Sequence, residues 1–439
     1  MTDDVTQDRT DRLHVLVAGA GLAGLALAQG LVKAGHTVEV FERDEDLDRK
    51  QGYYLHFNPI GGEALRRALP EDLFELYLET SRASYDRPES IVLNDQLEEL
   101  TSRPHMGPPN PGPRPHTGVH RRTLRQILSG RLGESLHRGQ AVVSYAEDAD
   151  GVTVTLSDGS TARGDLLVGA DGIRSAVRAQ LLPEVPVIPT GIQGIGIYGR
   201  TPLTPELDEQ LPSILDQGVL MAVDRKGSRL LVANFRPRRP ADEAAAAIAP
   251  DVALDAVPAY AMVSCSVAPG TEVPPSREWT PETPPAMKES MLTALEGWHP
   301  AARALVTGME PDSMFMIPFG FLEPAESWTP SRVTIVGDAA HGMLPTLGMG
   351  ANLSLNDAAL LLDQVERYAA GEVGLLEAVG AYEEQMREVT YPILRMTLDH
   401  DSNFGGGGLK EATEAVEEAP AGQPTGQPAG QPVDQPADA

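Results

Sequence analysis

The chain has 439 residues, a hydrophobic content of 41% and a formal net charge of −28. This length predicts two or three domains with a sizeable core. The strong negative charge argues against nucleic acid and against an anionic membrane surface as partners. A phosphate-bearing cofactor is still compatible with it, because backbone N–H groups and a few arginines bind phosphate locally. The single cysteine, Cys265, excludes an intrachain disulfide and a cysteine-rich metal site, and we expect no bound metal.

The two ends of the sequence carry no predicted structure. The first residues, "MTDDVTQDRTDR", are polar and lack the apolar centre of a signal peptide. No stretch approaches the length of a membrane span, so we expect a cytoplasmic protein. The last residues repeat Gly-Gln-Pro-x and cannot bury enough apolar surface to offset the entropy of ordering. We therefore expect 401–439 to form a disordered tail.

The first predicted unit in chain order is a β-α-β unit. "LHVLVA" (13–18) is too short and too continuously apolar for a helix and predicts a buried strand. An Ala- and Leu-rich helix follows to about Ala34, and Gly35 is a typical helix stop. "TVEVF" (37–41) predicts the second strand, with a right-handed crossover between the two.

The turn inside this unit reads Gly19-Ala20-Gly21-Leu22-Ala23-Gly24. Gly19 permits a tight turn, Gly21 lets the backbone approach a pyrophosphate, and Gly24 lets the helix pack close to the sheet. Glu42 ends the second strand at the distance expected for a ribose-binding acid. The pattern predicts a dinucleotide site but leaves NAD and FAD open. The structural alternative is a glycine-rich turn with Glu42 as a solvated strand end.

The middle of the chain contains a Pro- and Gly-rich stretch and then segments that alternate between apolar and polar residues. Residues 103–118 are too rich in Pro and Gly for a helix or a central strand and predict a loop. "GVTVTLSDGS" (151–160) predicts a hairpin that turns at Asp158-Gly159. From about 185 to 315, alternating apolar and polar segments predict antiparallel strands in a second domain. Two helices are expected at roughly 353–370 and 375–398.

Two further strand-to-helix turns contain an aspartate. In "GDLLVGADGIRSAVR" (164–178), Asp171 follows a buried strand, and helix capping alone would explain it. In "VTIVGDAAHGMLPTLGMGAN" (333–352), Asp338 can accept hydrogen bonds from sugar hydroxyls. The segment from Gly348 to Asn352 begins a helix whose free N–H groups can face an anion. His341 is a weak catalytic candidate, with a structural role as the alternative.

Taken together, these turns resemble the group A flavoprotein monooxygenases of the para-hydroxybenzoate hydroxylase type, which carry the three motifs in this order. The resemblance spans roughly 13–400. "HRRTLRQIL" (120–128) matches the Arg-x-x-Leu segment of that family, in which the residue aligned with Arg121 contacts the flavin nucleotide. The family commonly has Gly-Gln-Gly where this chain has Gly348-Met349-Gly350, and a methionine cannot make the hydrogen bonds of an amide.

The resemblance implies non-covalent FAD on the first turn rather than NAD. The first glycines would hold the pyrophosphate, Glu42 the adenosine ribose, and Asp338 the ribityl and pyrophosphate region. The loop from Pro345 to Asn352 would lie beside the isoalloxazine ring. The implied cofactor-binding residues are Gly19, Gly21, Leu22, Ala23, Gly24, Glu42, Arg43, Arg121, Asp171, Asp338, Pro345, Gly348, Gly350, Ala351 and Asn352.

The implied fold class is α/β: a Rossmann-like FAD-binding domain of the glutathione-reductase type, joined to a second α+β substrate domain built on an antiparallel sheet. The expected boundaries are 1–77, 103–183 and 315–400 for the discontinuous FAD-binding domain with C-terminal helices, and 78–102 and 184–314 for the substrate domain. We expect a monomer or a homodimer.

The implied activity is that of an NADPH- or NADH-consuming monooxygenase, which inserts one oxygen atom of O₂ into an apolar, aromatic or polycyclic molecule through a flavin C(4a)-hydroperoxide. Epoxidation and Baeyer–Villiger oxidation remain alternatives, as do a flavin dehydrogenase or oxidase and a non-catalytic flavin protein. A flavin-dependent halogenase is disfavoured because the chain lacks Trp-x-Trp-x-Ile-Pro. The expected substrate wall includes Tyr54, His56, Phe235 and Phe319, with plain core packing as the alternative for each of them. His56 is a second weak catalytic candidate.

Overall fold

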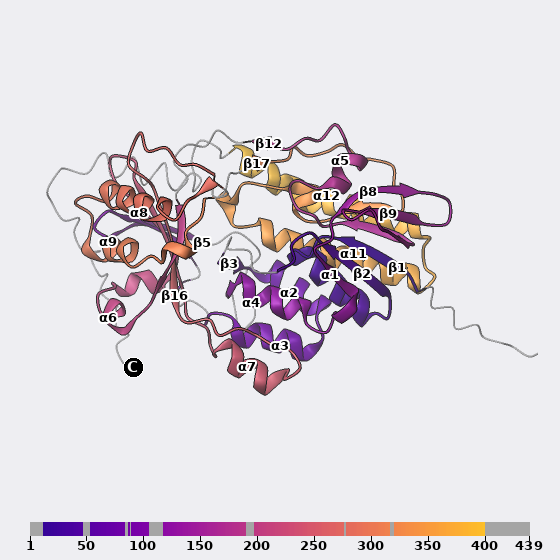
Figure 1. Cartoon of the computed structure of the whole chain (residues 1–439), viewed down its shortest axis with the longest axis horizontal. Coiled ribbons are helices and arrows are strands. Elements are labelled where there is room, and N and C mark those ends of the chain that lie inside the picture. Colours follow the sequence, from indigo (N-terminus) through magenta and orange to yellow (C-terminus); the bar gives the residue numbers. More distant parts are fainter. Residues whose placement is uncertain are drawn as a thin grey trace, which may run out of the picture.

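The computed structural model describes residues 12–46, 53–83, 87, 89–104, 117–189, 197–275, 278–316 and 320–399. The expected C-terminal tail, Phe319 and most of the Pro-rich loop lie outside these ranges. The described residues form two lobes, with the six-stranded sheet in one and the glycine turns in the other (Figure 1). None of the described helices is long and apolar enough to cross a membrane.

The first lobe is built on a five-stranded parallel sheet in the order β18-β11-β1-β2-β7. Parallel strands are buried on both faces, which explains why the central strands are continuously apolar. In β1, for example, Val15, Leu16 and Val17 have no exposed surface. The strands are β1 (His14–Ala18), β2 (Thr37–Glu42), β7 (Leu136–Arg138), β11 (Leu166–Gly169) and β18 (Val333–Ile335).

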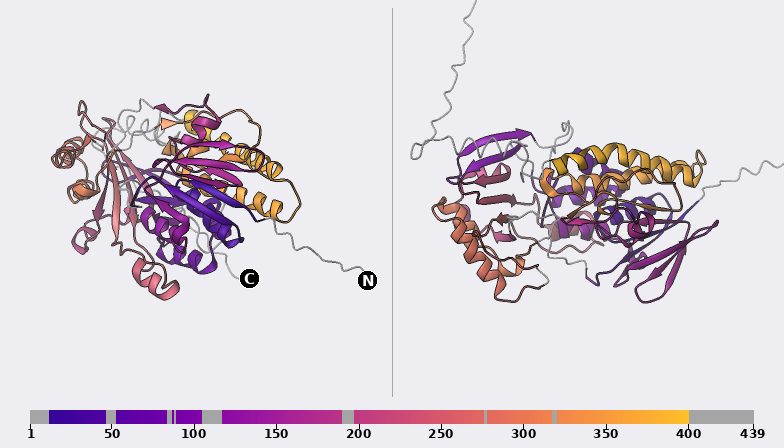
Figure 2. Two further views of the ribbon diagram at one scale, coloured as in Figure 1. Left: turned by 45° about the vertical axis from the view of Figure 1, so that its right-hand side comes forward. Right: turned by 90° about the horizontal axis from the view of Figure 1, so that it is seen from above.

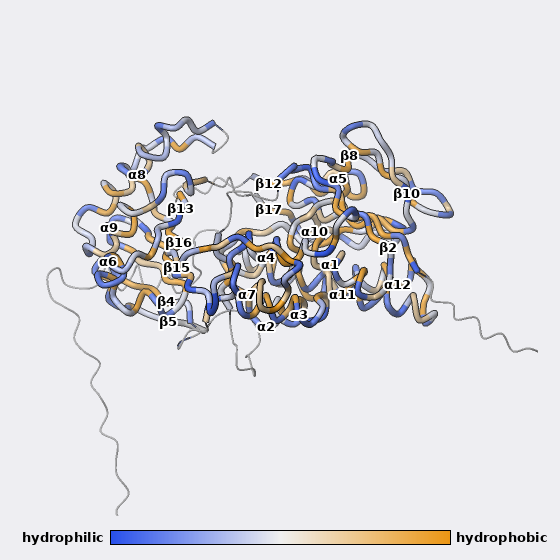
Figure 3. Tube along the Cα trace, turned by 60° about the horizontal axis from the view of Figure 1, so that its bottom comes forward, coloured by the Kyte–Doolittle hydropathy of each residue, from blue (hydrophilic) through white to orange (hydrophobic). Residues whose placement is uncertain are grey.

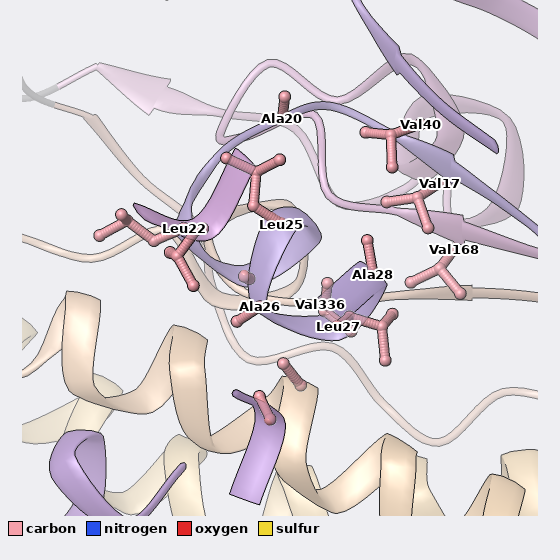
Figure 4. Packing of buried hydrophobic residues seen from close by; sticks show 14 of the residues in the cluster. Val17, Ala20, Leu22, Leu25, Ala26, Leu27, Ala28, Val40, Val168 and Val336 are labelled. Atoms are coloured by element: carbon pink, nitrogen blue, oxygen red, sulfur yellow. The ribbon is translucent and has the colours of Figure 1, made fainter. Parts of the chain in front are cut away.

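Helix α1 (Leu22–Lys33) lies against this sheet. Val17, Val40 and Val168 come from three neighbouring strands and lie beside Leu25 and Ala28 of the helix (Figure 4). The hairpin β8–β10 packs into the same core. Along the chain, hydrophobic residues gather on the inner strands and helix faces, and hydrophilic residues on the outer turns (Figure 3).

Several helices and one short ribbon complete the first lobe. The C-terminal helix α11 lies beside α1, although the two are more than 300 residues apart in sequence, and α12 packs on α11 (Figure 1). The elements are the ribbon of β3 (Tyr54–Phe57) and β6 (Thr117–His120), the hairpin strands β8 (Val142–Glu147), β9 (Val152–Leu156) and β10 (Thr161–Gly164), and the helices α2 (Pro59–Ala68), α3 (Glu71–Thr80), α4 (Arg121–Ser129), α5 (Ala176–Leu181), α10 (Asp338–His341), α11 (Gly350–Ala369) and α12 (Leu375–Asp399).

The second lobe is a six-stranded sheet in the order β13-β16-β15-β14-β4-β5. Its pairs are antiparallel except for β14 with β4, so the expected antiparallel sheet contains one parallel pair. Helices α8 (Thr283–Ala294) and α9 (Pro300–Thr307) cover the face that points away from the first lobe (Figure 2). The strands are β4 (Glu89–Asn94), β5 (Glu99–Pro104), β13 (Ile197–Pro202), β14 (Gly218–Val223), β15 (Arg229–Phe235) and β16 (Tyr260–Cys265).

The chain crosses between the lobes more often than the sequence-based division expects. Helix α7 (Ala241–Ile248) and the segment to Leu254 follow the second sheet but pack into the core of the first lobe. The chain enters the second lobe after the short strand β12 (Ile188–Pro189) and has returned from it at β17 (Gly320–Phe321). These two strands pair with each other. The alternating apolar and polar pattern of 185–315 predicts strands, but it does not show that α7 packs against the first lobe. Only the contacts of the folded chain show to which core a helix belongs.

The local predictions that depend on glycine geometry are confirmed. Gly35 follows α1 with a φ of +88°, and Gly159 has a φ of +85° at the tip of the β9–β10 hairpin. Both angles favour glycine because a Cβ atom clashes there. The predicted helices correspond to α11 and α12. Within 103–118, Pro104 ends the edge strand β5 and Thr117 begins β6.

One buried arginine ties the lobes together where the chain first crosses. Arg82 follows α3 and donates to the carbonyl oxygens of Asn234 (2.8 Å), Ala83 (2.9 Å) and Asp216 (2.7 Å). Its own backbone N–H donates to Gly118 O at 2.7 Å. Arg82 therefore links the second lobe, through its guanidinium, to the β3–β6 ribbon, through its backbone N–H.

Replacing Arg82 by methionine should lower the free energy of unfolding by about 2–4 kcal/mol, because the buried carbonyl of Asn234 and two less buried carbonyl groups lose a charged donor. Urea denaturation followed by circular dichroism measures the change. Arg163→Met is the control, since Arg163 pairs with Asp148 on an exposed hairpin. A loss no larger than that of the control would show that Arg82 does not hold the lobes together.

Candidate active site

The three glycine turns meet at one edge of the parallel sheet. Ala18 pairs with Gly169, and Gly169 pairs with Ile335, so the turns after β1, β11 and β18 leave the sheet at the same level. Parallel strands place their carboxyl ends at one edge, where open α/β sheets bind ligands. Glu42, at the end of β2, lies at this edge too. The convergence expected from the sequence is therefore present.

Gly19 and Gly24 are required by the packing of the chain itself. A Cβ atom on Gly19 would lie 2.5 Å from Ala170 O, and its φ of +104° is unfavourable for other residues. A Cβ atom on Gly24 would lie 2.2 Å from Gly19 O, which confirms that this glycine allows close contact between the turn and the helix.

Gly21 is different, because no neighbouring atom explains it. A Cβ atom there would meet only Ala170 O, at an ordinary 3.8 Å, and its φ of −72° suits any residue. Gly21 is the N-cap of α1 and offers no side-chain hydrogen bond to the first turn. Open space over a glycine beside free helix N–H groups fits the phosphates of a nucleotide. Leu22 and Ala23 contribute to this turn through their backbone, since both side chains are buried.

Glu42 is fixed by two backbone donors and one arginine. Its Oε2 accepts from Ala20 N at 2.9 Å, and its Oε1 accepts from Asp44 N at 3.1 Å. Arg125 on α4 lies 3.7 Å from Oε2 and donates to Ala20 O at 2.9 Å. Both side chains are almost fully buried. Glu42 is therefore part of the wall behind the glycine turn, and Arg125 orients it.

The sequence analysis did not identify Arg125. The signal was present in "HRRTLRQIL", because Arg121 and Arg125 are four residues apart and share one helix face. The half-buried Arg121 begins α4, and its N–H donates to Tyr53 O at 2.8 Å. Arg43 points outward, with 58% of its side chain exposed and its Nε 3.6 Å from Asp44.

Asp171 supports the start of α5, although the N-cap of this helix is Ser175 and not Asp171. Its Oδ2 accepts from Ala176 N at 2.7 Å at the start of α5. Burial raises the pKa of Asp171 despite these hydrogen bonds. Arg178, on the same helix, is buried and donates to Ala339 O at 3.1 Å. The second turn thus supports the third turn.

In the third turn, a buried pair holds an exposed aspartate in place. Gly337 has a φ of +62°, and Asp338 begins α10 with its side chain exposed to solvent. Below it, His341 and Asp357 are fully buried, with Nε2 and Oδ2 2.6 Å apart. The same Asp357 oxygen accepts from Gly337 N at 2.8 Å. His341 is therefore a positioning residue, because no ligand reaches a side chain without exposed surface.

The protonation of His341 reflects two opposing effects. Burial lowers the pKa of the imidazole, but the charge of Asp357 and its hydrogen bond outweigh burial and raise the pKa overall. The protonated form is thus favoured beside the buried carboxylate.

The loop from Pro345 to Asn352 presents backbone rather than side chains at the edge. Gly348 is exposed in the left-handed region with a φ of +65°, and Gly350 and Ala351 open the long helix α11. Pro345 is exposed at the start of the loop. Met349 instead points inward and is 2% exposed, and its sulfur accepts from Asn58 Nδ2 at 3.4 Å. The departure from Gly-Gln-Gly therefore changes the core under the loop.

Asn352 also serves the protein rather than a ligand. Its Oδ1 accepts from Asn58 N at 2.9 Å, and its Nδ2 donates to His56 O (3.0 Å) and Gly348 O (3.1 Å). The side chain has no exposed surface, which corrects the expectation that it contacts the cofactor. The amide instead locks the loop against β3 and the N-terminus of α2.

Two of the expected substrate residues lie in a closed aromatic cluster. Tyr54 and Phe235 are 7% and 1% exposed and pack with Tyr260. Tyr260 Oη lies 2.9 Å from Nδ1 of His120, and burial lowers the pKa of His120 to about 3. The cluster seals the junction of the lobes rather than lining an open wall. His56 is partly exposed on β3, beside the loop.

A polar cavity of about 240 Å³ opens beside Glu42. It lies between α4, the end of β7 and the segment after α7. Arg138, one of its lining residues, is opposite Glu42 in the register of β7 and β2. The lining residues are Asp46, Arg122, Gln126, Ser129, Gly130, Arg138, Asp251, Val252 and Ala253. These charged and amide groups do not suit an apolar substrate. In the described part of the chain, no group of three or more His, Cys, Asp or Glu side chains could hold a metal ion.

Buried polar residues of α12 support β18 from behind. Glu383 has no exposed surface, and its Oε1 accepts from Thr334 Oγ1 at 2.9 Å. Tyr382 Oη donates to Ile335 O at 2.8 Å. Burial raises the pKa of Glu383 to about 7 from an ordinary 4.5. The strand that carries Asp338 thus rests on a carboxyl group that the fold prefers protonated.

The wild type and Glu383→Gln should therefore differ in stability in a pH-dependent way. The folded state retains a proton that the unfolded state loses above pH 4.5, so ionisation destabilises the wild type as the pH rises from 4.5 to 7. Glutamine keeps the acceptor and cannot ionise. The free energy of unfolding of Glu383→Gln should equal that of the wild type at pH 4.5 and exceed it at pH 8 by up to about 3 kcal/mol.

Urea denaturation at the two pH values measures this difference. Glu384→Gln is the matched control, because Glu384 is the exposed neighbour on the same helix. Equal stability of the wild type and Glu383→Gln at pH 8 would contradict the raised pKa.

Gly21 and Gly24 make a paired test of the first turn. Gly24→Ala should destabilise the fold, because its Cβ atom meets a backbone oxygen at 2.2 Å. Gly21→Ala should leave the melting temperature of the ligand-free protein within about 2 °C of the wild type and weaken nucleotide binding at least tenfold. Thermal melts and nucleotide titrations separate the two effects. Undiminished nucleotide binding by Gly21→Ala would show that the space over Gly21 has another purpose.

The family comparison agrees with this geometry. A model of the FAD binding domain matches residues 63–244 and 323–394, more than half of the chain. A model of the NAD(P)-binding Rossmann-like domain matches residues 17–47, which contain the first glycine turn.

The similar proteins include enzymes and solved structures. The chain is 29% identical over 425 residues to the dual O-methyltransferase/FAD-dependent monooxygenase CTB3 of Cercospora beticola, with 92% of this chain and 48% of that protein covered. It therefore spans about half the length of that relative. A protein of Photorhabdus luminescens subsp. laumondii TTO1, described as a candidate FAD-containing monooxygenase, is 28% identical at a TM-score of 0.72, with 92% of this chain and 99% of that chain covered.

A third similarity concerns the fold alone. HpxO of Klebsiella pneumoniae, solved with FAD and uric acid, is 20% identical at a TM-score of 0.68. The alignment covers 93% of each chain.

Proposed function

The chain belongs to the FAD-binding-domain family of the group A flavoprotein monooxygenases, and from this premise we propose that it is an FAD-dependent monooxygenase. It would consume NADPH or NADH and insert one oxygen atom of O₂ into an apolar, aromatic or polycyclic small molecule. The observation that carries the proposal is the meeting of Gly21, Glu42 and Asp338 with the start of α11 at one sheet edge.

The residues at this edge fit FAD. The space over Gly21 and the free N–H groups of α1 suit the pyrophosphate, and the fixed carboxylate of Glu42 suits the adenosine ribose. Asp338 is exposed and can accept from the ribityl hydroxyls. When bound, the flavin supplies what side chains cannot: it takes a hydride from the nicotinamide nucleotide and activates molecular oxygen.

The contribution of the chain is electrostatic placement and exclusion of water. Gly350 and Ala351 lie in the first turn of α11, a 20-residue helix whose N-terminal N–H groups favour negative charge. The aromatic cluster around Tyr260 closes one side of the site to solvent. We assign no general base, because His341 and His120 are both buried and a pKa of about 3 makes the imidazole of His120 too weak a base to accept a proton near neutral pH. One chain supplies all of these groups, so a monomer or a homodimer would suffice.

The proposal is tested by the visible spectrum of purified protein under anaerobic conditions. FAD bands should bleach on addition of NADPH or NADH, and faster with one compound from a panel of aromatic and polyketide-like molecules. Under ¹⁸O₂, that compound should gain one labelled oxygen atom. Bleaching without incorporation of labelled oxygen would indicate a flavin dehydrogenase or oxidase. FAD bands that do not change on addition of either nucleotide would indicate a non-catalytic flavin protein. The product would distinguish hydroxylation, epoxidation and Baeyer–Villiger oxidation.

Asp338→Ala should weaken FAD binding at least tenfold, because the ribityl chain would lose a charged acceptor at the third turn. The ratio of FAD absorbance to protein absorbance after gel filtration measures retention. Asp150→Ala is the control, since Asp150 is equally exposed but lies in a hairpin turn. Equal retention by the two variants would remove Asp338 from the cofactor site.

A further inference from the structure

The long helix α12 covers the first lobe with one face and carries further apolar residues outside that face. Tyr382, Met386 and Leu394 belong to the core of the first lobe. The helix itself runs along the outside of this lobe, where it is the yellow ribbon in Figure 2. Val389 and Met396 are apolar, yet 40% and 39% of their surface is exposed. The packing of α12 on its own lobe therefore does not account for these two residues.

The exposed apolar residues form a stripe in the C-terminal half of the helix. Its members are Val389, Pro392, Ile393 and Met396, which are spaced at i, i+3, i+4 and i+7 and so lie on one side of the helix. Pro392 is exposed and Ile393 is half-buried. Single apolar residues at a surface need no explanation. A stripe over two turns is typical of a helix that packs against another apolar surface.

Two charged residues flank this α12 stripe on one edge. Glu388 directly precedes Val389, and Arg395 directly precedes Met396; both charged side chains are exposed. In the part of the chain that the structure describes, neither has an ion pair. They cannot pair with each other, because seven residues span about 10 Å along a helix. The edge thus carries one negative and one positive charge, both without a partner in their own chain.

Pro392 adds a further acceptor at the same edge. Proline has no backbone N–H, so the carbonyl group of Glu388, four residues earlier, lacks its usual helical donor. The carboxylate and the carbonyl oxygen of Glu388 therefore both face solvent-side donors. An arginine suits such a pair of acceptors, since its guanidinium carries several N–H donors in one plane.

A second copy of the chain supplies that arginine if the two helices pack antiparallel. The midpoint between positions 388 and 395 lies inside the stripe, beside Pro392. A two-fold axis at this point brings Glu388 of each copy beside Arg395 of the other while the two stripes face each other. A two-fold interface is self-complementary, so each contact occurs twice. A parallel pair in register would instead place identical residues at one level and form neither ion pair.

We propose that the α12 stripe is the interface of a homodimer in which two copies of α12 pack antiparallel around a two-fold axis near Pro392. The inference is independent of the proposed function, because it uses no residue of the ligand edge. An interface centred on one pair of helices is at the small end of specific interfaces, so we expect a dissociation constant of about 10 μM.

The test is sedimentation velocity of the purified full-length chain at about 1 to 100 μM, with about 150 mM salt to screen the repulsion between two acidic copies. The wild type should change from monomer to dimer across this range. Val389→Asp should weaken dimerisation at least tenfold, because it places a carboxylate inside the stripe. Leu376→Asp is the matched control, since Leu376 is 48% exposed on another side of the same helix. It should dimerise as the wild type does.

A charge exchange tests the antiparallel arrangement. Glu388→Arg and Arg395→Glu should each weaken dimerisation at least tenfold, because like charges then meet twice in the interface. The double variant should restore the dissociation constant of the wild type within threefold, since it recreates both ion pairs with their signs exchanged. Glu377→Arg is the control for net charge: it makes the same change at an exposed position about 16 Å from Glu388 and should have no effect.

Three results would overturn the proposal. The wild type could remain a monomer throughout the concentration range, Val389→Asp could dimerise as the wild type does, or the double variant could fail to recover. A monomeric wild type that instead sediments with phosphatidylcholine vesicles, and loses this binding in Val389→Asp, would show that the stripe contacts lipid, which also overturns the proposal.

Discussion

Parallel pairing of β18, β11, β1 and β2 is the constraint on which the site depends. Because these strands run in one direction, each delivers its following turn to the same edge, although β1 and β18 are more than 300 residues apart. The turns can then share a ligand that none of them could hold alone. The glycine positions follow from the same constraint, since Gly19 and Gly24 allow the turn, the helix and the neighbouring strand to approach each other closely.

Behind this edge, a layer of buried polar side chains fixes the groups that face a ligand. Arg125 orients Glu42, the pair of His341 and Asp357 holds the third turn, and Asn352 locks the loop at the start of α11. Buried polar groups are costly unless they are fully hydrogen-bonded, so these networks permit few alternative arrangements. A rigid edge of this kind suits a site that works by preorganised electrostatics, because the donors need not reorganise when a charge develops.

The junction of the two lobes divides the second sheet into regions with different roles. Near Phe235, aromatic rings and the neutral His120 fill the space and join the lobes. Farther along the same face the sheet is less completely covered, and the side chains of Leu231, Met221 and Val219 are only partly buried.

The sequence alone determined the first β-α-β unit, the hairpin at Asp158-Gly159, the two C-terminal helices and the order of the three turns. These features rest on local rules: apolar runs, glycine conformation and helix stops act over a few residues. The resemblance carried by the turns also specified the family, because their combination is far more specific than any one of them.

Tertiary structure decided which side chains face the ligand edge. Asn352, Met349 and His341 belong to the right segment, but their side chains point into the protein. Tyr54 and Phe235 were chosen for their aromatic character, yet the docking of the ribbon against the sheet buries them together. Arg125 and Arg82 acquire their roles only from partners that are distant in the sequence. Burial and long-range pairing are properties of the assembled layers, and no short stretch of sequence encodes them.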